Sequence, residues 1–184
     1  MDRNAVSLVI LLLSVGLLAF CASTPDETPE TPETPPPQVV ATALVDLFPT
    51  EGSEVNGSVT FEETNGRVKI TAEVSGLAPG KHGFHIHEIG DCSSPDASSA
   101  KGHLNPGNTQ HGAPDSPTHH AGDLGNIEAD AEGNASFQMT VDFITLSEGP
   151  NSVNSKAVIV EADEDEFDPS RSDGARLACG VIEM

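Results

Sequence analysis

The sequence predicts one all-β domain that follows an export signal and a tether. Two observations predict the β class. Short apolar runs with an alternation of period two recur from Val39 onward, and turn-forming residues separate them. In addition, no long stretch carries the apolar spacing of an amphipathic helix. Short strands at this spacing typically close into a Greek-key barrel or sandwich.

Seven segments are expected to form strands because apolar and β-branched residues dominate them. They are residues 39–47, 57–63, 68–74, 83–88, 135–143, 157–161 and 177–182. Turn signals such as Thr64-Asn65-Gly66 lie between them. The 36-residue stretch 90–125 has no strand pattern and is longer than an ordinary structureless loop. We therefore expect a metal ion or a disulfide to order it.

Length and charge limit the possible functions. The chain has 184 residues, with 8 Lys and Arg against 29 Asp and Glu, which gives a formal net charge of -21. Residues 38–184 have the length of one ordinary domain. Neutralising phosphates requires clustered basic residues, so this composition excludes nucleic-acid binding and disfavours anionic membrane surfaces.

The N-terminus is predicted to direct export. Residues 1–20 form an apolar run with the length of a signal-peptide core. Cys21 follows it directly, as the lipid-bearing cysteine does in bacterial lipoproteins, although Phe20 is bulkier than the small residue such signals carry. Cleavage nearby, or a retained anchor, is the alternative. Residues 21–37 are predicted to be a lipidated cysteine and an extended tether of Pro, Glu and Thr. We expect a protein of the cell envelope or periplasm that contacts a membrane only through its lipid.

The chain has three cysteines, and an exported protein folds where disulfides persist. Three cysteines can form one disulfide and leave one cysteine unpaired. Cys21 is expected to be the unpaired one, so Cys92 and Cys179 are expected to pair. The alternative is that both remain free thiols.

All seven histidines lie between residues 82 and 120. His85 and His87 are two residues apart in a predicted strand and project from one face, while Phe84 and Ile86 project from the other. Imidazoles with a nearby carboxylate, here Asp123, suit zinc or copper. Surface histidines on a long loop are the plain alternative, but this explains only one or two of the seven.

Five motifs extend this pattern through the domain. They are His82-Gly-Phe-His-Ile-His-Glu88, Gly102-His-Leu-Asn-Pro106, His111-Gly-Ala-Pro114, His120-Ala-Gly-Asp-Leu-Gly-Asn126 and Gly174-Ala-Arg-Leu-Ala-Cys-Gly-Val-Ile182. In this order they resemble the copper/zinc superoxide dismutase family, from about residue 41 to the end. The resemblance implies an eight-stranded Greek-key barrel with two long loops, a Cys92–Cys179 bridge and a two-metal site outside the barrel.

The resemblance also implies the site residues. The zinc ligands would be three histidines and a carboxylate, namely His103, His111, His120 and Asp123. Copper would be bound by His85, His87 and His103, so His103 would bridge the two metals and shuttle a proton. Arg176 would hold the superoxide anion beside copper, and Asp165 would orient ligands of both metals.

Glu161 departs from the family pattern. The fourth copper ligand of the family is a histidine at the end of a strand, and here that strand reads Ala157-Val-Ile-Val-Glu161. A carboxylate is a harder ligand that favours Cu(II) over Cu(I). We expect a lower copper potential, weaker retention of Cu(I), or both. The acidic surface also opposes the approach of superoxide.

Three functions remain open at this stage. The first is an exported dismutase that converts superoxide to oxygen and hydrogen peroxide. The second is a non-catalytic copper- and zinc-binding or copper-delivery module, because the resemblance extends to the dismutase-like domain of eukaryotic copper chaperones. The third is a zinc-stabilised structural or interaction domain, in which Arg176 simply pairs with a neighbouring acid. His82 is expected to be structural and His119 to have no role. The family includes both homodimers and monomers.

Overall fold

The structure is a computed structural model that describes residues 39–168, 170 and 174–184. The predicted signal, Cys21 and the tether lie outside these residues, as does the start of the predicted domain at residue 38. Within the described residues, no helix is long and apolar enough to cross a membrane.

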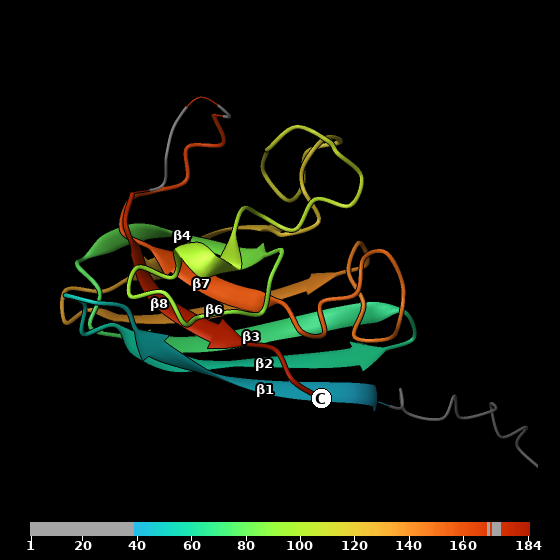
Figure 1. Cartoon of the computed structure of the whole chain (residues 1–184), viewed down its shortest axis with the longest axis horizontal. Coiled ribbons are helices and arrows are strands. Elements are labelled where there is room, and N and C mark those ends of the chain that lie inside the picture. The colour runs from blue at the N-terminus through green and yellow to red at the C-terminus, as the bar shows by residue number, and fades with distance from the viewer. Residues whose placement is uncertain (1–38, 169, 171–173) are drawn as a thin grey trace, which may run out of the picture. The chain divides into compact units, whose positions relative to one another are not determined.

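Eight antiparallel strands form a closed barrel (Figure 1). In chain order they are β1 (Val39–Pro49), β2 (Asn56–Thr64), β3 (Arg67–Ser75), β4 (Gly80–His87), β5 (Asp123–Ala129), β6 (Asn134–Val141), β7 (Ala157–Glu161) and β8 (Arg176–Val181). Around the barrel the order is β1-β2-β3-β6-β5-β4-β7-β8. The connections from β3 to β4 and from β6 to β7 join strands that are not neighbours, which is a Greek-key arrangement. The predicted fold class is confirmed.

Alternation places the core inside the barrel. Along β3 the buried residues alternate with exposed or half-buried ones. Side chains at zero exposure from several strands, including Phe61, Ile70, Phe84 and Ile127, fill the interior. Between β2 and β3 the turn residues Asn65 and Gly66 both have positive φ, at 52° and 73°. This left-handed pair suits a tight hairpin between right-twisted strands.

Strand β5 is the one strand that the sequence pattern missed. It begins at Asp123, inside the stretch expected to lack strands, and runs to Ala129. Its alternation is interrupted because Asp123, Leu124 and Gly125 are all buried, and Gly125 has φ 86°. The pairing of β4 with β5 also shifts register at this point. A bulge of this kind removes the period of two on which the prediction depended.

We call residues 88–122 the first loop and the described part of residues 162–175 the second loop. Both lie over β4 and β7 on the same side of the barrel (Figure 1). The first loop contains a single 3-10 turn, Ser98–Ala100. The predicted disulfide between Cys92 and Cys179 is confirmed, with 5.8 Å between the Cα atoms, and it ties the first loop to β8.

Candidate metal centre

Two clusters of ligand-type side chains share one histidine. We call His85, His87, His103 and Glu161 the Glu161 set, and His103, His111, His120 and Asp123 the Asp123 set. In each set, four ligand atoms lie within 4.8 Å of one another. The structure therefore brings together all the residues that the family resemblance suggested as metal ligands.

Main-chain pairing of the first loop with β4 creates this proximity. The Leu104 amide donates to the Ile86 carbonyl at 2.8 Å, and the Ile86 amide donates to the Gly122 carbonyl at 2.9 Å. His87 and His103 also form an isolated β-bridge. A Cβ atom on Gly122 would clash with the Ile86 carbonyl oxygen, so only glycine allows the loop to approach this closely.

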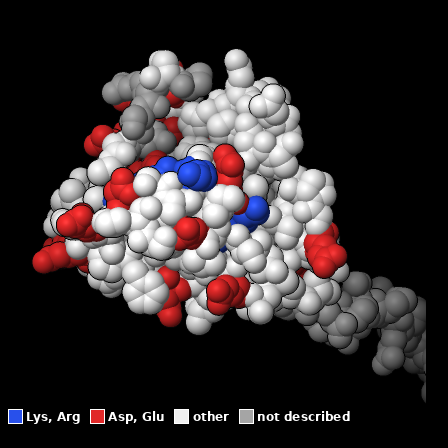
Figure 2. All heavy atoms as spheres, in the orientation of Figure 1, with Lys and Arg blue, Asp and Glu red and all other residues white. Residues whose placement is uncertain are grey.

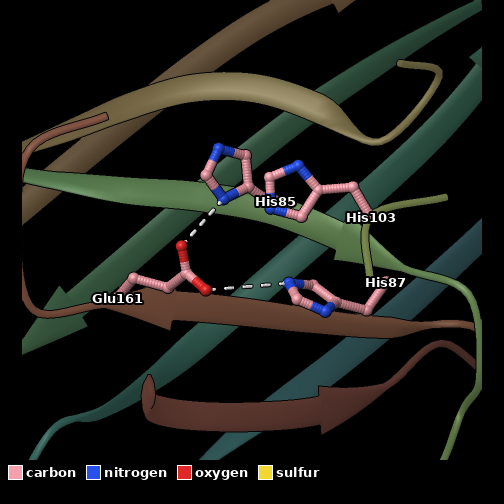
Figure 3. Close-up of side chains that lie close together, drawn as sticks. All are labelled: His85, His87, His103 and Glu161. Atoms are coloured by element: carbon pink, nitrogen blue, oxygen red, sulfur yellow. Dashed lines mark ion pairs between the residues drawn. The ribbon is translucent and has the colours of Figure 1, made fainter. Parts of the chain in front are cut away.

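The Glu161 set lies mainly on two paired strands (Figure 3). His85 and His87 lie on β4, and Glu161 ends the neighbouring β7. The Glu161 carboxylate points between the two imidazoles: Oε2 lies 3.2 Å from His85 Nδ1 and Oε1 lies 3.9 Å from His87 Nε2. The His103 ring stacks on the His85 ring with 4.0 Å between centroids. Barrel pairing therefore determines the geometry of this set.

Hydrogen bonds outside the set orient its imidazoles. His87 Nδ1 donates to the Lys101 carbonyl at 2.9 Å, so Nε2 keeps its lone pair toward the set. This Nε2 is buried and has no hydrogen-bond partner among the described residues. His85 Nε2 lies 3.0 Å from Asp165 Oδ2, which turns Nδ1 toward Glu161. Such outer contacts fix the tautomer of metal-binding histidines.

Asp123 is the centre of the other set. Its side chain is fully buried, and its oxygens lie 2.8 Å from His103 Nδ1, 3.1 Å from His111 Nδ1 and 3.2 Å from His120 Nδ1. They also accept hydrogen bonds from the backbone amides of Gly112 and His120. The Nδ1 atoms of His111 and His120 are both buried. Three imidazole nitrogens and one carboxylate fit a tetrahedral zinc ion.

Asp165 contacts both sets. One oxygen lies 3.0 Å from His85 Nε2, and the other lies 2.9 Å from His111 Nε2. Asn126 holds Asp165 through two hydrogen bonds: the Asp165 amide donates to Asn126 Oδ1, and Asn126 Nδ2 donates to the Asp165 carbonyl. This role of Asn126 was not foreseen from the sequence. A polar residue inside a strand is the only signal that could have indicated it.

Burial and pairing shift the pKa values of the imidazoles. Burial lowers the pKa of His85, but hydrogen bonds to Asp165 and Glu161 outweigh it and raise the pKa to about 9. Burial, together with the charge of His103, lowers the pKa of His87 to about 3. His87 is therefore neutral at neutral pH, the form that binds metals.

The Asp123 set shows the same competition between burial and pairing. Hydrogen bonds to Asp123 and Asp165 raise the pKa of His111 to about 10. Burial would raise the pKa values of the two aspartates, but their histidine partners hold both well below the usual range. Both carboxylates are ionised at neutral pH.

Arg176 lies at the edge of the Glu161 set. It begins β8 opposite Glu161 on β7, and its Nε lies 3.9 Å from Glu161 Oε1. Its Nη1 and Nη2 donate to the carbonyls of Ala97 and Lys101, at 2.6 Å and 2.5 Å. The neighbouring acid that the sequence analysis considered for Arg176 is thus Glu161 itself. The two carbonyl contacts were not foreseen, because every residue has a carbonyl and none marks this role in a sequence.

The remaining two histidines belong to neither set. The His82 ring nitrogens lie 3.0 Å from the Glu161 carbonyl and 2.8 Å from the Ala78 carbonyl, so His82 links β4 to β7 as a structural residue. His119 Nδ1 lies 2.6 Å from the His120 carbonyl, and its ring contacts Phe143 edge to face.

On the face of the protein that Figure 2 shows, Asp and Glu side chains surround the few Lys and Arg side chains. One basic residue, Lys81, pairs with Glu164 of the second loop at 2.8 Å, with both side chains about half exposed. The surface therefore offers an approaching anion little net attraction.

Known proteins resemble this chain in sequence and structure. The family profile "Copper/zinc superoxide dismutase (SODC)" matches residues 55–182. "Superoxide dismutase [Cu-Zn] 2" of Brassica juncea is 43% identical over 137 residues, covering 70% of this chain and 89% of the relative. "Extracellular superoxide dismutase [Cu-Zn]" of Brugia pahangi is 37% identical over 153 residues, covering 77% and 75%.

A solved structure agrees with the sequence relatives. The crystal structure of the clock protein EA4 matches with a TM-score of 0.71 and 33% identity, covering 79% of this chain and 96% of that protein. The family match spans most of the chain, and the first relative is more than 30% identical over most of its own length. This chain therefore belongs to the copper/zinc superoxide dismutase family, oxidoreductases that use copper and zinc and act on superoxide.

Proposed function

We propose that this protein is an exported superoxide dismutase whose copper ligands include a carboxylate. The Glu161 set would hold copper and the Asp123 set would hold a structural zinc. The observation that carries this proposal is that two four-ligand clusters share the single residue His103. A shared imidazole can bind one metal through each ring nitrogen only when it is deprotonated.

Each residue of the centre has a separate role in this proposal. A bound copper ion supplies the one-electron oxidation and reduction that dismutation requires. Arg176 attracts the superoxide anion toward the Glu161 set, where its guanidinium is held by the two carbonyls. His103 would take up and release a proton on Nε2, the ring nitrogen that does not face Asp123. Asp165 keeps one histidine of each set in position.

Glu161 is expected to lower the rate without abolishing it. Its carboxylate favours Cu(II) over Cu(I), which slows the half-reaction that reduces the metal. It also lies near Arg176 and offsets part of the cationic charge that would attract superoxide.

The test is superoxide dismutation by the zinc- and copper-loaded protein, normalised to bound copper, beside the E161H variant. We expect a copper-dependent rate within about tenfold of the variant, comparable with the smallest losses seen when a partner of a metal ligand is altered. A native protein that is inactive while E161H is active would contradict the proposed activity.

That same outcome would favour a non-catalytic copper- and zinc-binding or copper-delivery module. The observation that supports this alternative is the contact of Glu161 with both His85 and His87, which puts a hard ligand at the copper position. Transfer of copper from the loaded protein to a chelator would then be faster than from E161H.

We further propose that residues 1–20 direct export to the cell envelope or periplasm and that Cys21 bears the lipid. The composition of the N-terminal segment supports this proposal. The C21A variant should leave the membrane fraction and appear in the soluble fraction of the envelope. Unchanged partitioning would contradict lipidation, and light scattering of the C21A protein would distinguish a homodimer from a monomer.

A further inference from the structure

The Glu161 set has the same donors as the Asp123 set. Each offers three imidazole nitrogens and one carboxylate oxygen, all within 4.8 Å of one another. This donor composition, with three imidazoles and one acid, suits a tetrahedral zinc ion. The structure thus contains two chemically equivalent sets side by side, joined through His103.

The geometry of the Glu161 set also suits a small divalent ion. His85 Nδ1 and Glu161 Oε2 lie 3.2 Å apart (Figure 3). Two ligands of a tetrahedral zinc ion with bonds of about 2.0 Å are separated by about 3.3 Å. Within the part of the chain that the structure describes, His87 Nε2 is buried without a hydrogen-bond partner, and the Lys101 carbonyl fixes the ring so that this nitrogen faces the set. Little rearrangement is needed to bind an ion here.

A carboxylate in this position discriminates between ions of different charge. Glu161 has only 5% of its surface exposed, so water screens its charge poorly. At a given distance it attracts a divalent ion twice as strongly as a monovalent one. Monovalent copper also prefers soft ligands, and a carboxylate is a hard one. Charge and ligand type therefore both disfavour Cu(I) relative to any divalent ion.

We propose that the Glu161 set is selective for divalent ions and that the metal-free protein takes up a second zinc ion there, in place of copper, when the copper supplied to it is monovalent. The inference rests on the ligand sets of the proposed function. When copper is divalent, it binds nitrogen and oxygen donors more tightly than zinc, and the same set then holds copper. The redox state of copper in the surroundings thus decides whether the protein carries one zinc or two.

The experiment counts the metals bound by the full chain. Metal-free protein is mixed with zinc and copper, with and without ascorbate under nitrogen, then desalted and analysed for both metals. With ascorbate we expect two zinc ions per chain in the native protein, and one zinc with one copper in E161H. E164Q is the matched control because Glu164 is an exposed acid on the second loop, and it should behave as the native protein does.

A second measurement covers the case in which E161H fails to fold. Cobalt(II) replaces zinc and gives a visible absorption band when its site is tetrahedral. The native protein should develop the absorption of its second cobalt ion at a lower cobalt concentration than E161Q does, since the variant lacks the anionic donor of one set. Identical titration curves for the two proteins would overturn the inference.

The inference and the proposed function fail separately. One zinc and one copper in the native protein under ascorbate, as in E161H, would overturn the inference. Dismutation by the copper-loaded protein in air would still support the proposed function in that case.

Discussion

The two ligand sets have the same donors, but different parts of the fold hold them in place. The Glu161 set takes three of its four members from β4 and β7, which are paired strands of the barrel. The Asp123 set takes its three histidines from the first loop, and only Asp123 lies on a strand. Barrel pairing therefore positions one set, whereas the other is held by a single buried carboxylate that contacts the loop. A substitution in the Asp123 set should therefore disturb the first loop as well, whereas a substitution in the Glu161 set should act mainly on that set.

Removal of the Asp123 charge should have the largest effect on metal binding and on the order of the first loop. In D123N the remaining oxygen can still accept the backbone hydrogen bonds of Gly112 and His120. The amide group is neutral, however, and its nitrogen replaces the oxygen that faces His103 and His120 and cannot bind zinc. We expect zinc affinity to fall by at least about 100-fold and the first loop to lose order, while His85 and His87 still bind copper.

Zinc and copper titrations and a melting curve measure this outcome. D115N is the matched control because Asp115 is an exposed acid of the same loop. Loss of both metals in D123N would show that the Glu161 set depends on the loop as much as the Asp123 set does, and the distinction between them would fail.

Reduction of the disulfide should have the next largest effect. The bond between Cys92 and Cys179 spans 87 residues and holds the part of the first loop that contains the carbonyls of Ala97 and Lys101. Loss of such a bridge typically costs about 2–5 kcal/mol. Because Arg176 donates to those two carbonyls, the Glu161 set should suffer more than the Asp123 set.

The measurement compares melting temperature, zinc affinity and dismutation rate with and without a reducing agent. We expect a lower melting temperature and a lower rate, with a smaller change in zinc affinity. An unchanged melting temperature would contradict a stabilising role for the bridge.

The alternation that predicted most of the barrel also explains the limits of the sequence analysis. It identified the strands other than β5 and placed His85 and His87 on one face, because both depend on a period of two. The bulge at Gly125 erased that period in β5. Loop residues have no period at all, so the assignment of His103 to both sets depended on family resemblance.

Contacts made by the main chain were outside the reach of the sequence. The Lys101 carbonyl serves both His87 and Arg176, yet its side chain takes no part in either contact. Lys101 has φ 68°, a left-handed conformation unusual for lysine, which no local signal predicts. The orientation of the site therefore depends on a backbone feature that only the folded structure reveals.

Truncation of Arg176 should affect the Glu161 set alone. In R176A the cation at the edge of this set is lost, and the second-order rate of dismutation should fall by about tenfold, the lower end of the range for electrostatic steering. Inhibition by small anions should weaken as well. Zinc affinity should not change, because Arg176 contacts no member of the Asp123 set among the described interactions.

R67A is the control for this change, since Arg67 is an exposed arginine of β3 on the surface of the barrel. Stopped-flow kinetics at several ionic strengths measure the rate. An R176A rate equal to that of R67A would remove Arg176 from the proposed mechanism.

The smallest expected effect is the pH dependence of zinc binding at the Asp123 set, which comes from the proton on His111. Hydrogen bonds to Asp123 and Asp165 raise the pKa of His111 to about 10, so His111 is protonated in the metal-free protein at neutral pH. These contacts stabilise the metal-free fold below the ordinary histidine pKa of 6.5, and this contribution is lost as the pH rises through about 10. Zinc needs the lone pair of His111 and must displace the proton, so zinc affinity should increase with pH over this range.

Calorimetric titration of zinc in two buffers with different ionisation enthalpies counts the released protons. We expect about one proton from His111 for each zinc bound at neutral pH. His87 should behave in the opposite way, because burial lowers its pKa to about 3 and leaves no proton to displace. A binding enthalpy that is the same in both buffers would mean that His111 is neutral before zinc binds. In that case Asp123 and Asp165 would position the imidazole without charging it.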